Sequence, residues 1–477
     1  SGFRRAIRVL SDSRNVSYRS RRKILWGALL AVSLLAAPAY AQEEDVWERL
    51  RELEQQVELL QSQLASQDST AIAELRRQIE AIAREIEELK LGREVVVQAD
   101  TGLYGLGPAA SKVYRVDQGV SIGGYGEMLY QNFAGEREDG SPSDRKDQLD
   151  FLRGVVYVGY KFNDRLLFNS EIEIEHASTD LAGSVSLEFA YVDYLIADAI
   201  GARAGLLLLP MGLINEQHEP TTFLGTERPA TELQIIPSTW RENGLGVFGQ
   251  AGGFVYRGYV VSALDGVGGG SSDASGFSAT GLRGGRQKGS KAVAEDFAGV
   301  VRVDYTGVLG LVLGTSIYAG NAGQGAVSPL DGTTIDASTV IWEGHAQYRA
   351  RGLDLRGLFA LSHVDDVTDI NAVKGLSGDE SVGERLVGWY LQGGYDVLRG
   401  VRSEQQLIPY VRYEQINTQD EVPEGFSSNP ATERRIITIG AAWKPIINLI
   451  VKADYLINKN EADTGVNQLN VSLGYLF

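Results

Sequence analysis

The sequence lacks several features on which common kinds of functional site depend. It has no cysteine among 477 residues, which excludes disulfide bonds and thiolate metal sites. Its four histidines are scattered without paired metal spacing, and it contains no H-E-x-x-H or G-x-S-x-G motif. We therefore expect no metal centre, no cofactor and no catalytic residues, and we predict that the chain is not an enzyme.

Basic charge and long apolar runs are also scarce. The formal net charge is −17, but residues 1–41 carry a local +7, so the rest of the chain carries −24. Nucleic acid needs a basic footprint, so an acidic chain of this kind is not expected to bind it. Apart from one shorter N-terminal run, no window has the 18 or more consecutive apolar residues of a membrane-spanning helix.

That N-terminal run has the pattern of a secretory signal peptide. Three basic residues at 21–23 precede the apolar stretch Ile24–Ala37, and an A-x-A site follows at 39–41. We assign residues 1–41 to an N-terminal extension and signal peptide. The rest of the chain is therefore expected outside the cytoplasm.

Residues 42–91 have a helical period. Apolar residues recur in alternating steps of four and three, with charged and amide side chains between them. The first series is Val46, Leu50, Leu53, Val57, Leu60 and Leu64; the phase breaks across Ala65 to Thr70, and the second series is Ile72, Leu75, Ile79, Ile82, Ile86 and Leu89. One apolar seam of this kind predicts an α-helical coiled coil in the periplasm, or a single helix packed against other structure. Gly92 ends the pattern, and residues 92–118 are expected to be a linker.

From residue 119 to 477 the period changes to two, which is typical of β-strands. We count sixteen, beginning near Val120, Leu149, Leu166, Val185, Ile200, Leu245, Phe254, Val293, Leu309, Thr339, Leu353, Arg385, Gln406, Arg434, Asn448 and Val466. Short turns alternate with long polar loops, as in a meander that crosses a membrane. The predicted fold is an all-β transmembrane barrel of 16 antiparallel strands. The alternative is a soluble sandwich, whose outer faces would be polar.

The last strand gives the clearest example of two unlike faces. Leu469, Val471, Leu473, Tyr475 and Phe477 fall on one side, with mostly polar residues on the other. Aromatic residues mark the membrane interface of outer-membrane barrels. We predict that Tyr475 and Phe477 form a signal for the barrel-assembly machinery.

Four stretches resemble the phosphate-selective porin O and P family: SIGGYGEMLY at 121–130, FLRGVVYVGYKF at 151–162, FNSEIEIE at 168–175 and GLLLLPMG at 205–212. The resemblance implies a homotrimer in the bacterial outer membrane, with the third external loop folded into each pore. That loop would be Pro210–Asn243. Its candidate constriction residues are Glu216, His218, Glu219, Glu227, Arg228, Glu232, Arg241 and Glu242.

The family selects anions with basic pore residues, and here the sequence departs from it. Alternation places residues of both signs in the lumen: Glu171, Glu173, Glu175, Arg302, Asp304, Glu343, Arg356, Arg412, Glu414, Lys452 and Asp454. Rings of acid favour cations and rings of base favour anions, while pairing across strands would only stiffen the wall. A basic loop cluster at Arg283, Arg286, Lys288 and Lys291 is read as a contact for lipopolysaccharide phosphates or as a solvated loop.

Two functions fit these observations. The first is a porin that lets small hydrophilic solutes or ions diffuse passively across the outer membrane. The second is a structural envelope protein that uses residues 42–91 as a periplasmic spacer or tether, with peptidoglycan or another periplasmic component as partner. Outer-membrane lipids are expected around the barrel in both cases.

Overall fold

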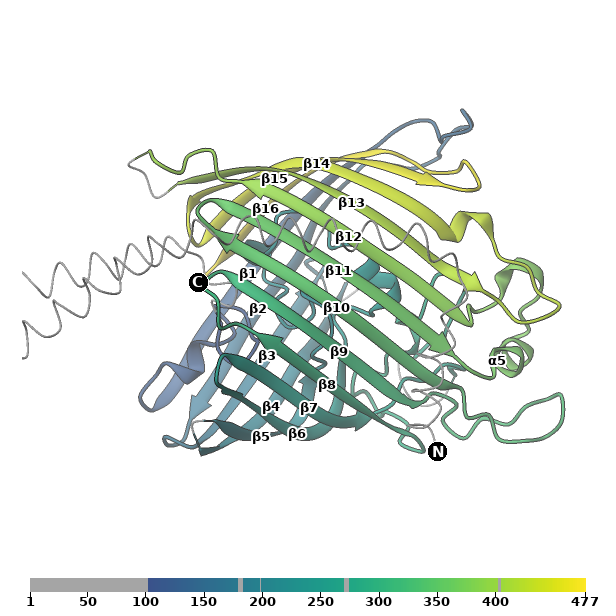
Figure 1. Ribbon diagram of the computed structural model, residues 1–477, viewed down its shortest axis with the longest axis horizontal. Coiled ribbons are helices and arrows are strands. Elements are labelled where there is room, and N and C mark those ends of the chain that lie inside the picture. The colour runs from purple at the N-terminus through teal and green to yellow at the C-terminus, as the bar shows by residue number, and fades with distance from the viewer. Residues whose placement is uncertain (1–101, 179–182, 198, 270–273, 402–404) are drawn as a thin grey trace, which may run out of the picture. The chain divides into compact units, whose positions relative to one another are not determined.

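The computed structural model describes residues 102–178, 183–197, 199–269, 274–401 and 405–477. Within these ranges sixteen β-strands close into one barrel (Figure 1). They are β1 (Gly119–Phe133), β2 (Gln148–Lys161), β3 (Leu166–Glu175), β4 (Ser184–Ala197), β5 (Ile200–Leu208), β6 (Arg241–Ala251), β7 (Phe254–Ser262), β8 (Phe297–Tyr305), β9 (Leu311–Asn321), β10 (Ser338–Ala350), β11 (Leu353–Val364), β12 (Arg385–Tyr395), β13 (Gln406–Glu421), β14 (Glu433–Ile446), β15 (Leu449–Asn460) and β16 (Gln468–Leu476).

Each strand pairs antiparallel with the next strand in the chain, and β1 pairs with β16 to close the ring. At this seam Gly124 N donates to Phe477 O over 3.1 Å, and Phe477 N donates to Gly124 O over 2.9 Å. A Cβ on Gly124 would lie 2.6 Å from Phe477 Cζ, and one on Gly126 would lie 2.5 Å from Tyr475 Cζ. A side chain at either glycine would therefore clash with the aromatic ring of Phe477 or Tyr475.

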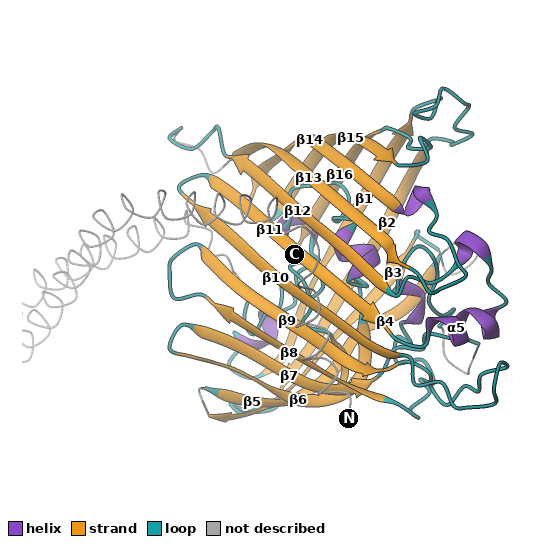
Figure 2. Cartoon of the chain, turned by 45° about the vertical axis from the view of Figure 1, so that its right-hand side comes forward, coloured by secondary structure: helices purple, strands orange, loops and turns teal. Residues whose placement is uncertain are grey.

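The two ends of the barrel differ. At one end, the turn end, connections such as 252–253, 351–352 and 447–448 are short. At the other, the loop end, connections such as 263–296, 322–337 and 365–384 are long, and the last of these contains the helix α5 (Val367–Lys374). Figure 2 shows the longer loops and α5 gathered at one end of the strands. This alternation matches the predicted meander.

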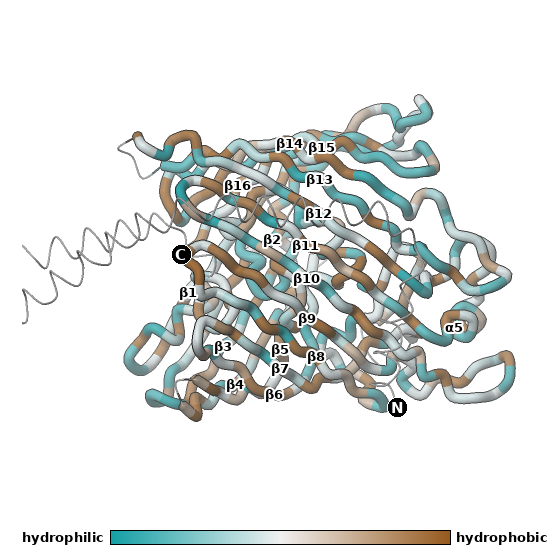
Figure 3. The backbone as a smooth tube through the Cα atoms, in the orientation of Figure 1, coloured by the Kyte–Doolittle hydropathy of each residue, from teal (hydrophilic) through white to brown (hydrophobic). Residues whose placement is uncertain are grey.

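The barrel wall has an apolar outer face and a polar inner face. In β10 the outward residues Val340, Trp342 and Ala346 alternate with Glu343 and His345, which are buried inside. In β16 Leu469 and Val471 are exposed, as predicted. Brown apolar positions recur along the strands in Figure 3. An outer wall this apolar is suited to hydrocarbon, so the soluble sandwich is wrong. None of the helices in the described part of the chain is long and apolar enough to span a membrane.

The predicted strand count is confirmed, and most strand starts lie within two residues of their predicted positions. The exceptions are β6, which begins at Arg241 rather than Leu245, and β8, which begins at Phe297 rather than Val293. The predicted signal peptide at 1–41 and coiled coil at 42–91 lie outside the described residues. Of the predicted linker 92–118, residues 102–118 are described, and they include the short helix η2 (Lys112–Tyr114).

Candidate permeation pathway

The connection from β5 to β6, residues 209–240, folds into the lumen and is called the lumenal loop below. It contains the short helices η3 (Pro220–Thr222) and η4 (Thr231–Ile235). Its first turn is fixed by Glu232, whose Oε2 accepts hydrogen bonds from the backbone N of Leu213 at 2.7 Å and Ile214 at 2.8 Å. Tyr390 Oη on β12 donates to Glu232 Oε1 over 2.6 Å. The predicted constriction loop is therefore a packed structure within the barrel.

The lumenal loop ends earlier than predicted. Arg241 and Glu242 were assigned to it, but they are the first residues of β6. Arg241 Nη1 lies 2.5 Å from Glu188 Oε1 on β4. Glu242 Oε1 accepts a hydrogen bond from Gln287 N over 2.8 Å. Both side chains thus have partners, on the wall or in the loop 263–296, which lets the strand begin there despite two charged residues.

The middle of the lumenal loop is attached to the opposite wall. Arg356 on β11 donates to Thr222 O over 2.7 Å, and Lys452 Nζ on β15 donates to Gly225 O over 2.8 Å. Asp454 on β15 accepts from Thr226 N at 2.7 Å and from Thr226 Oγ1 at 2.8 Å. The loop therefore crosses the lumen from β5 to β15. Three of the predicted lumen-lining residues therefore use their charged groups to bind the loop.

The predicted acidic ladder on β3 is paired rather than free. Glu171 Oε1 lies 3.1 Å from His218 Nε2 of the lumenal loop, and Glu173 lies 3.3 Å from Arg153. Glu175 accepts from Ser184 Oγ over 3.2 Å. Burial alone would lower the pKa of His218, but the Glu171 carboxylate outweighs it and the pKa is raised. The ladder is therefore partly neutralised by neighbouring cations.

A second buried network lies between the lumenal loop and β7, β8 and β10. Glu216 Oε2 lies 2.8 Å from Arg257 Nη1, and Arg257 also pairs with Asp304. Arg302 Nε lies 2.8 Å from Asp304, and His345 bridges Asp304 at 2.9 Å and Glu343 at 2.8 Å. Burial raises the pKa of Glu216, and Arg257 opposes the rise.

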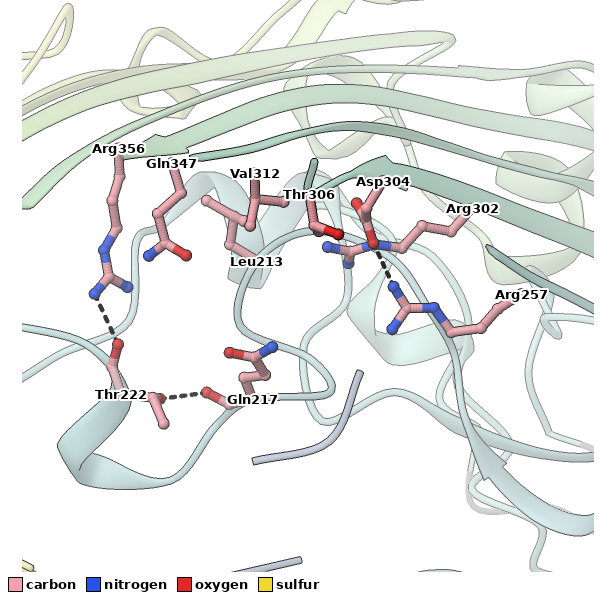
Figure 4. Close-up of a pocket in the computed structure, with 10 residues that line it drawn as sticks. All are labelled: Leu213, Gln217, Thr222, Arg257, Arg302, Asp304, Thr306, Val312, Gln347 and Arg356. Atoms are coloured by element: carbon pink, nitrogen blue, oxygen red, sulfur yellow. Dashed lines mark hydrogen bonds and ion pairs between the residues drawn. The ribbon is translucent and has the colours of Figure 1, made fainter. Parts of the chain in front are cut away.

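Figure 4 shows Arg257 and Arg302 turned toward Asp304, and Arg356 reaching the carbonyl of Thr222. The cavity that these side chains line measures about 20 Å³. That is room for about one water molecule. Little free space is therefore left between these side chains.

A larger cavity, about 330 Å³, lies between the lumenal loop and strands β1 and β13–β16, and is called the loop-end cavity below. Its lining includes five basic and two acidic side chains: Arg145, Arg228, Arg412, Arg434, Lys459, Glu227 and Glu414. Arg412 Nε lies 3.6 Å from Glu414. Burial raises the pKa of Glu227, which accepts from Gln131 and Gln468 at 2.6 and 2.9 Å. Lys459 pairs with Glu138 at 3.4 Å, and the remaining four basic and two acidic side chains still leave an excess of positive charge.

Sequence reasoning missed part of this lining. Arg434 was noticed only as a strand start, and Arg145 lies in the loop after β1. An alternation rule applied to β14 would have placed Arg434 on the inner face, two residues before the buried Ile436. The loop residue Arg145 had no signal of that kind.

The basic cluster in residues 263–296 corrects another expectation. Arg286 Nη1 donates to Ser238 O at 2.7 Å and to Thr239 O at 2.8 Å, and Arg283 Nη1 donates to Ser238 O at 2.5 Å. Burial lowers the pKa of Arg283 to about 9 and that of Arg286 to about 10. These two arginines hold the end of the lumenal loop, so a solvated loop does not describe them. Contact of the cluster with lipopolysaccharide phosphates stays a prediction.

A closed sixteen-stranded barrel with an apolar outer wall, a charged lumen and a loop folded inward after β5 has the architecture of an outer-membrane porin. Among solved structures, OmpF of Salmonella typhi in complex with daunomycin is similar, with a TM-score of 0.50 and 13% identity, over 76% of this chain and 98% of that one. The channel DcaP of Acinetobacter baumannii gives a TM-score of 0.44 and 13% identity, over 75% and 97%. These likenesses concern the fold.

No family model matches the sequence. An uncharacterized protein of Aquifex aeolicus (strain VF5) is 37% identical over 377 residues, which cover 77% of this chain and 82% of that protein. The chain belongs to the same family as this Aquifex protein. Membership of the phosphate-selective porin O and P family stays a prediction.

Proposed function

We propose that the protein is an outer-membrane channel through which small hydrophilic solutes and ions diffuse passively. The observation that carries this proposal is a closed barrel, apolar outside, whose polar lumen is narrowed by a loop attached to both walls. A loop held by charged side chains leaves a passage of fixed size. The loop-end cavity is then the external approach to that passage.

The charge of the loop-end cavity favours anions over cations. Its basic side chains outnumber its acidic ones by five to two. Nη2 of Arg228 is buried and has no hydrogen-bond partner among the described residues, so no neighbouring acceptor offsets this part of its charge. Two of the three carboxylates of the acidic ladder on β3 pair with Arg153 and His218, which reduces the opposing charge.

The test is electrical. Purified full-length protein is added to planar bilayers, and a salt gradient is applied across them. Stepwise conductance with a reversal potential of the sign for anion flow is expected. The absence of any conductance would contradict the proposed channel function. Conductance with a cation-selective reversal potential would contradict only the proposed preference for anions.

The remaining partners are proposals as well. Assembly as a homotrimer and recognition of Tyr475 and Phe477 by the barrel-assembly machinery follow from the resemblance and from the seam packing. The spacer hypothesis depends on residues 42–91, which lie outside the described residues, and no described residue favours it over the channel.

A further inference from the structure

Residues 102–118, called the entry segment below, lie inside the turn end of the barrel. Leu106, Ala109, Ala110 and Val113 are each 4% exposed or less. Leu106, Ala109 and Ala110 belong to the same buried cluster as Tyr157, Phe189 and Tyr191 of the wall. Figure 1 draws the segment in dark blue at the end where the short turns lie. A segment that only linked two parts of the chain would not need four buried apolar side chains.

Polar contacts join the entry segment to the wall along its length. Tyr114 Oη donates to Asp193 Oδ2 on β4 over 2.6 Å and accepts from Arg203 Nη2 on β5 over 2.8 Å. Asn169 Nδ2 on β3 donates to Ala110 O over 2.9 Å. Near the C-terminal end of the segment, Lys161 Nζ on β2 donates to Val116 O over 2.8 Å. The segment is therefore attached to four successive strands.

The lumenal loop is attached to the same segment through one carboxylate. Glu219 Oε1 accepts hydrogen bonds from Ala109 N at 3.0 Å and from Ala110 N at 2.9 Å. A Cβ on Gly107 would lie 2.6 Å from Glu219 Cδ, so the backbone and the carboxylate meet at a position that only glycine allows. Two adjacent backbone N–H groups that converge on one carboxyl group fix its position with two hydrogen bonds.

We infer that the entry segment is a fixed plug that narrows the turn-end mouth of the channel, and that Glu219 is the positioning residue through which the plug holds the lumenal loop. The plug covers the wall from β2 to β5, and so directs flow toward the opposite side of the lumen. This inference rests on the proposed channel function for its effect on conductance. The position of the plug can be tested without any conductance.

The surroundings of Glu219 support a closed, dry contact. The charged and titratable groups that face it are His218 beside it, Glu171 on β3 and Tyr157 on β2. Burial raises the pKa of Glu219 to about 7, and the hydrogen bonds from Ala110 and Ala109 oppose the rise. Glu219 itself is only 1% exposed.

Because the chain has no cysteine, single cysteines can report on the position of the plug. Val113→Cys places a thiol on the buried face and Asp117→Cys places one on an exposed residue of the same segment. Full-length protein in detergent is treated with a charged methanethiosulfonate reagent. We expect Val113→Cys to react at least about tenfold more slowly than Asp117→Cys, because its labelling requires local opening. Equal rates would show that the segment does not plug the lumen.

The role of Glu219 is tested in the Val113→Cys background. Glu219→Ala removes two hydrogen bonds to the plug and should speed labelling about ten- to a hundredfold. Glu219→Gln preserves the size of the side chain and should give an intermediate rate, which covers the case that the Ala variant does not fold. The matched control is Asp331→Ala, which removes a carboxylate that accepts two hydrogen bonds from Thr333 in the loop 322–337 at the loop end of the barrel.

Asp331→Ala should change the labelling rate by less than about twofold, because its partners lie at the opposite end of the barrel from the plug. An unchanged rate in both Glu219 variants would overturn the positioning role. In bilayers Glu219→Ala should also raise the conductance. If no variant conducts at all, the proposed channel is wrong, while the labelling rates still decide whether the entry segment is a plug.

Discussion

A single substitution at Asp454 should weaken the attachment of the lumenal loop to the barrel wall. Its carboxylate accepts three hydrogen bonds, from Thr226 N at 2.7 Å, Thr226 Oγ1 at 2.8 Å and Tyr410 Oη at 2.7 Å. A hydrogen bond to a charged acceptor contributes about 1.5–3 kcal/mol. Because contributions within one network do not add fully, Asp454→Ala should weaken the attachment by about 3 kcal/mol in total.

A loss of about 3 kcal/mol corresponds to a roughly 150-fold larger population of the detached loop. We expect single channels of Asp454→Ala in planar bilayers to show a larger mean conductance and stronger current noise than the wild type. The heat-resistant folded band on a gel should persist, because the strand pairs on either side of β15 do not use this side chain.

Asp331→Ala is the matched control. Asp331 accepts from Thr333 N at 2.9 Å and from Thr333 Oγ1 at 2.7 Å, so it makes the same pair of bonds to a threonine in an exposed external loop. Its removal should leave conductance and noise unchanged. If folded Asp454→Ala conducts as the wild type does, residues 209–240 do not limit the channel and the reasoning is refuted.

Three further predictions follow from the same structure. Arg434→Gln should shift the reversal potential toward cation selectivity, because it removes one positive charge from the loop-end cavity. Arg435→Gln, at an exposed neighbouring position, should not shift it. Equal shifts would show that the loop-end cavity does not set the ion preference. Gly124→Ala should cost about 1–3 kcal/mol by overpacking the seam, while Gly299→Ala, with open space around it, should melt as the wild type does. The pKa of Glu219 is raised when the plug is in place, so protonation of Glu219 favours the plugged state. Labelling of Val113→Cys, corrected for the fraction of thiolate, should therefore be slower at pH 5.5 than at pH 8. A faster corrected rate at pH 5.5 would contradict this linkage.

The sequence determined the barrel wall by itself. Side chains of a strand alternate strictly between two faces, so a wall between hydrocarbon and water leaves a period of two in every strand. The count of sixteen strands and the outward faces of β10 and β16 follow from this local rule. The missed start of β6 shows its limit. Arg241 and Glu242 are charged, and only their partners Glu188 and Gln287, far away in the chain, make them acceptable in a strand.

Only the tertiary structure decided what the lumenal charges do. Alternation could place Arg356, Lys452 and Asp454 inside, but it could not show that they hold a loop more than a hundred residues away in the chain. Likewise the residues at 102–118 look like a turn-rich linker in sequence, because their burial depends on the wall that surrounds them. A period along one strand records which face a side chain occupies. Its partner across the lumen is set by the closure of the barrel, which brings together residues that share no local pattern.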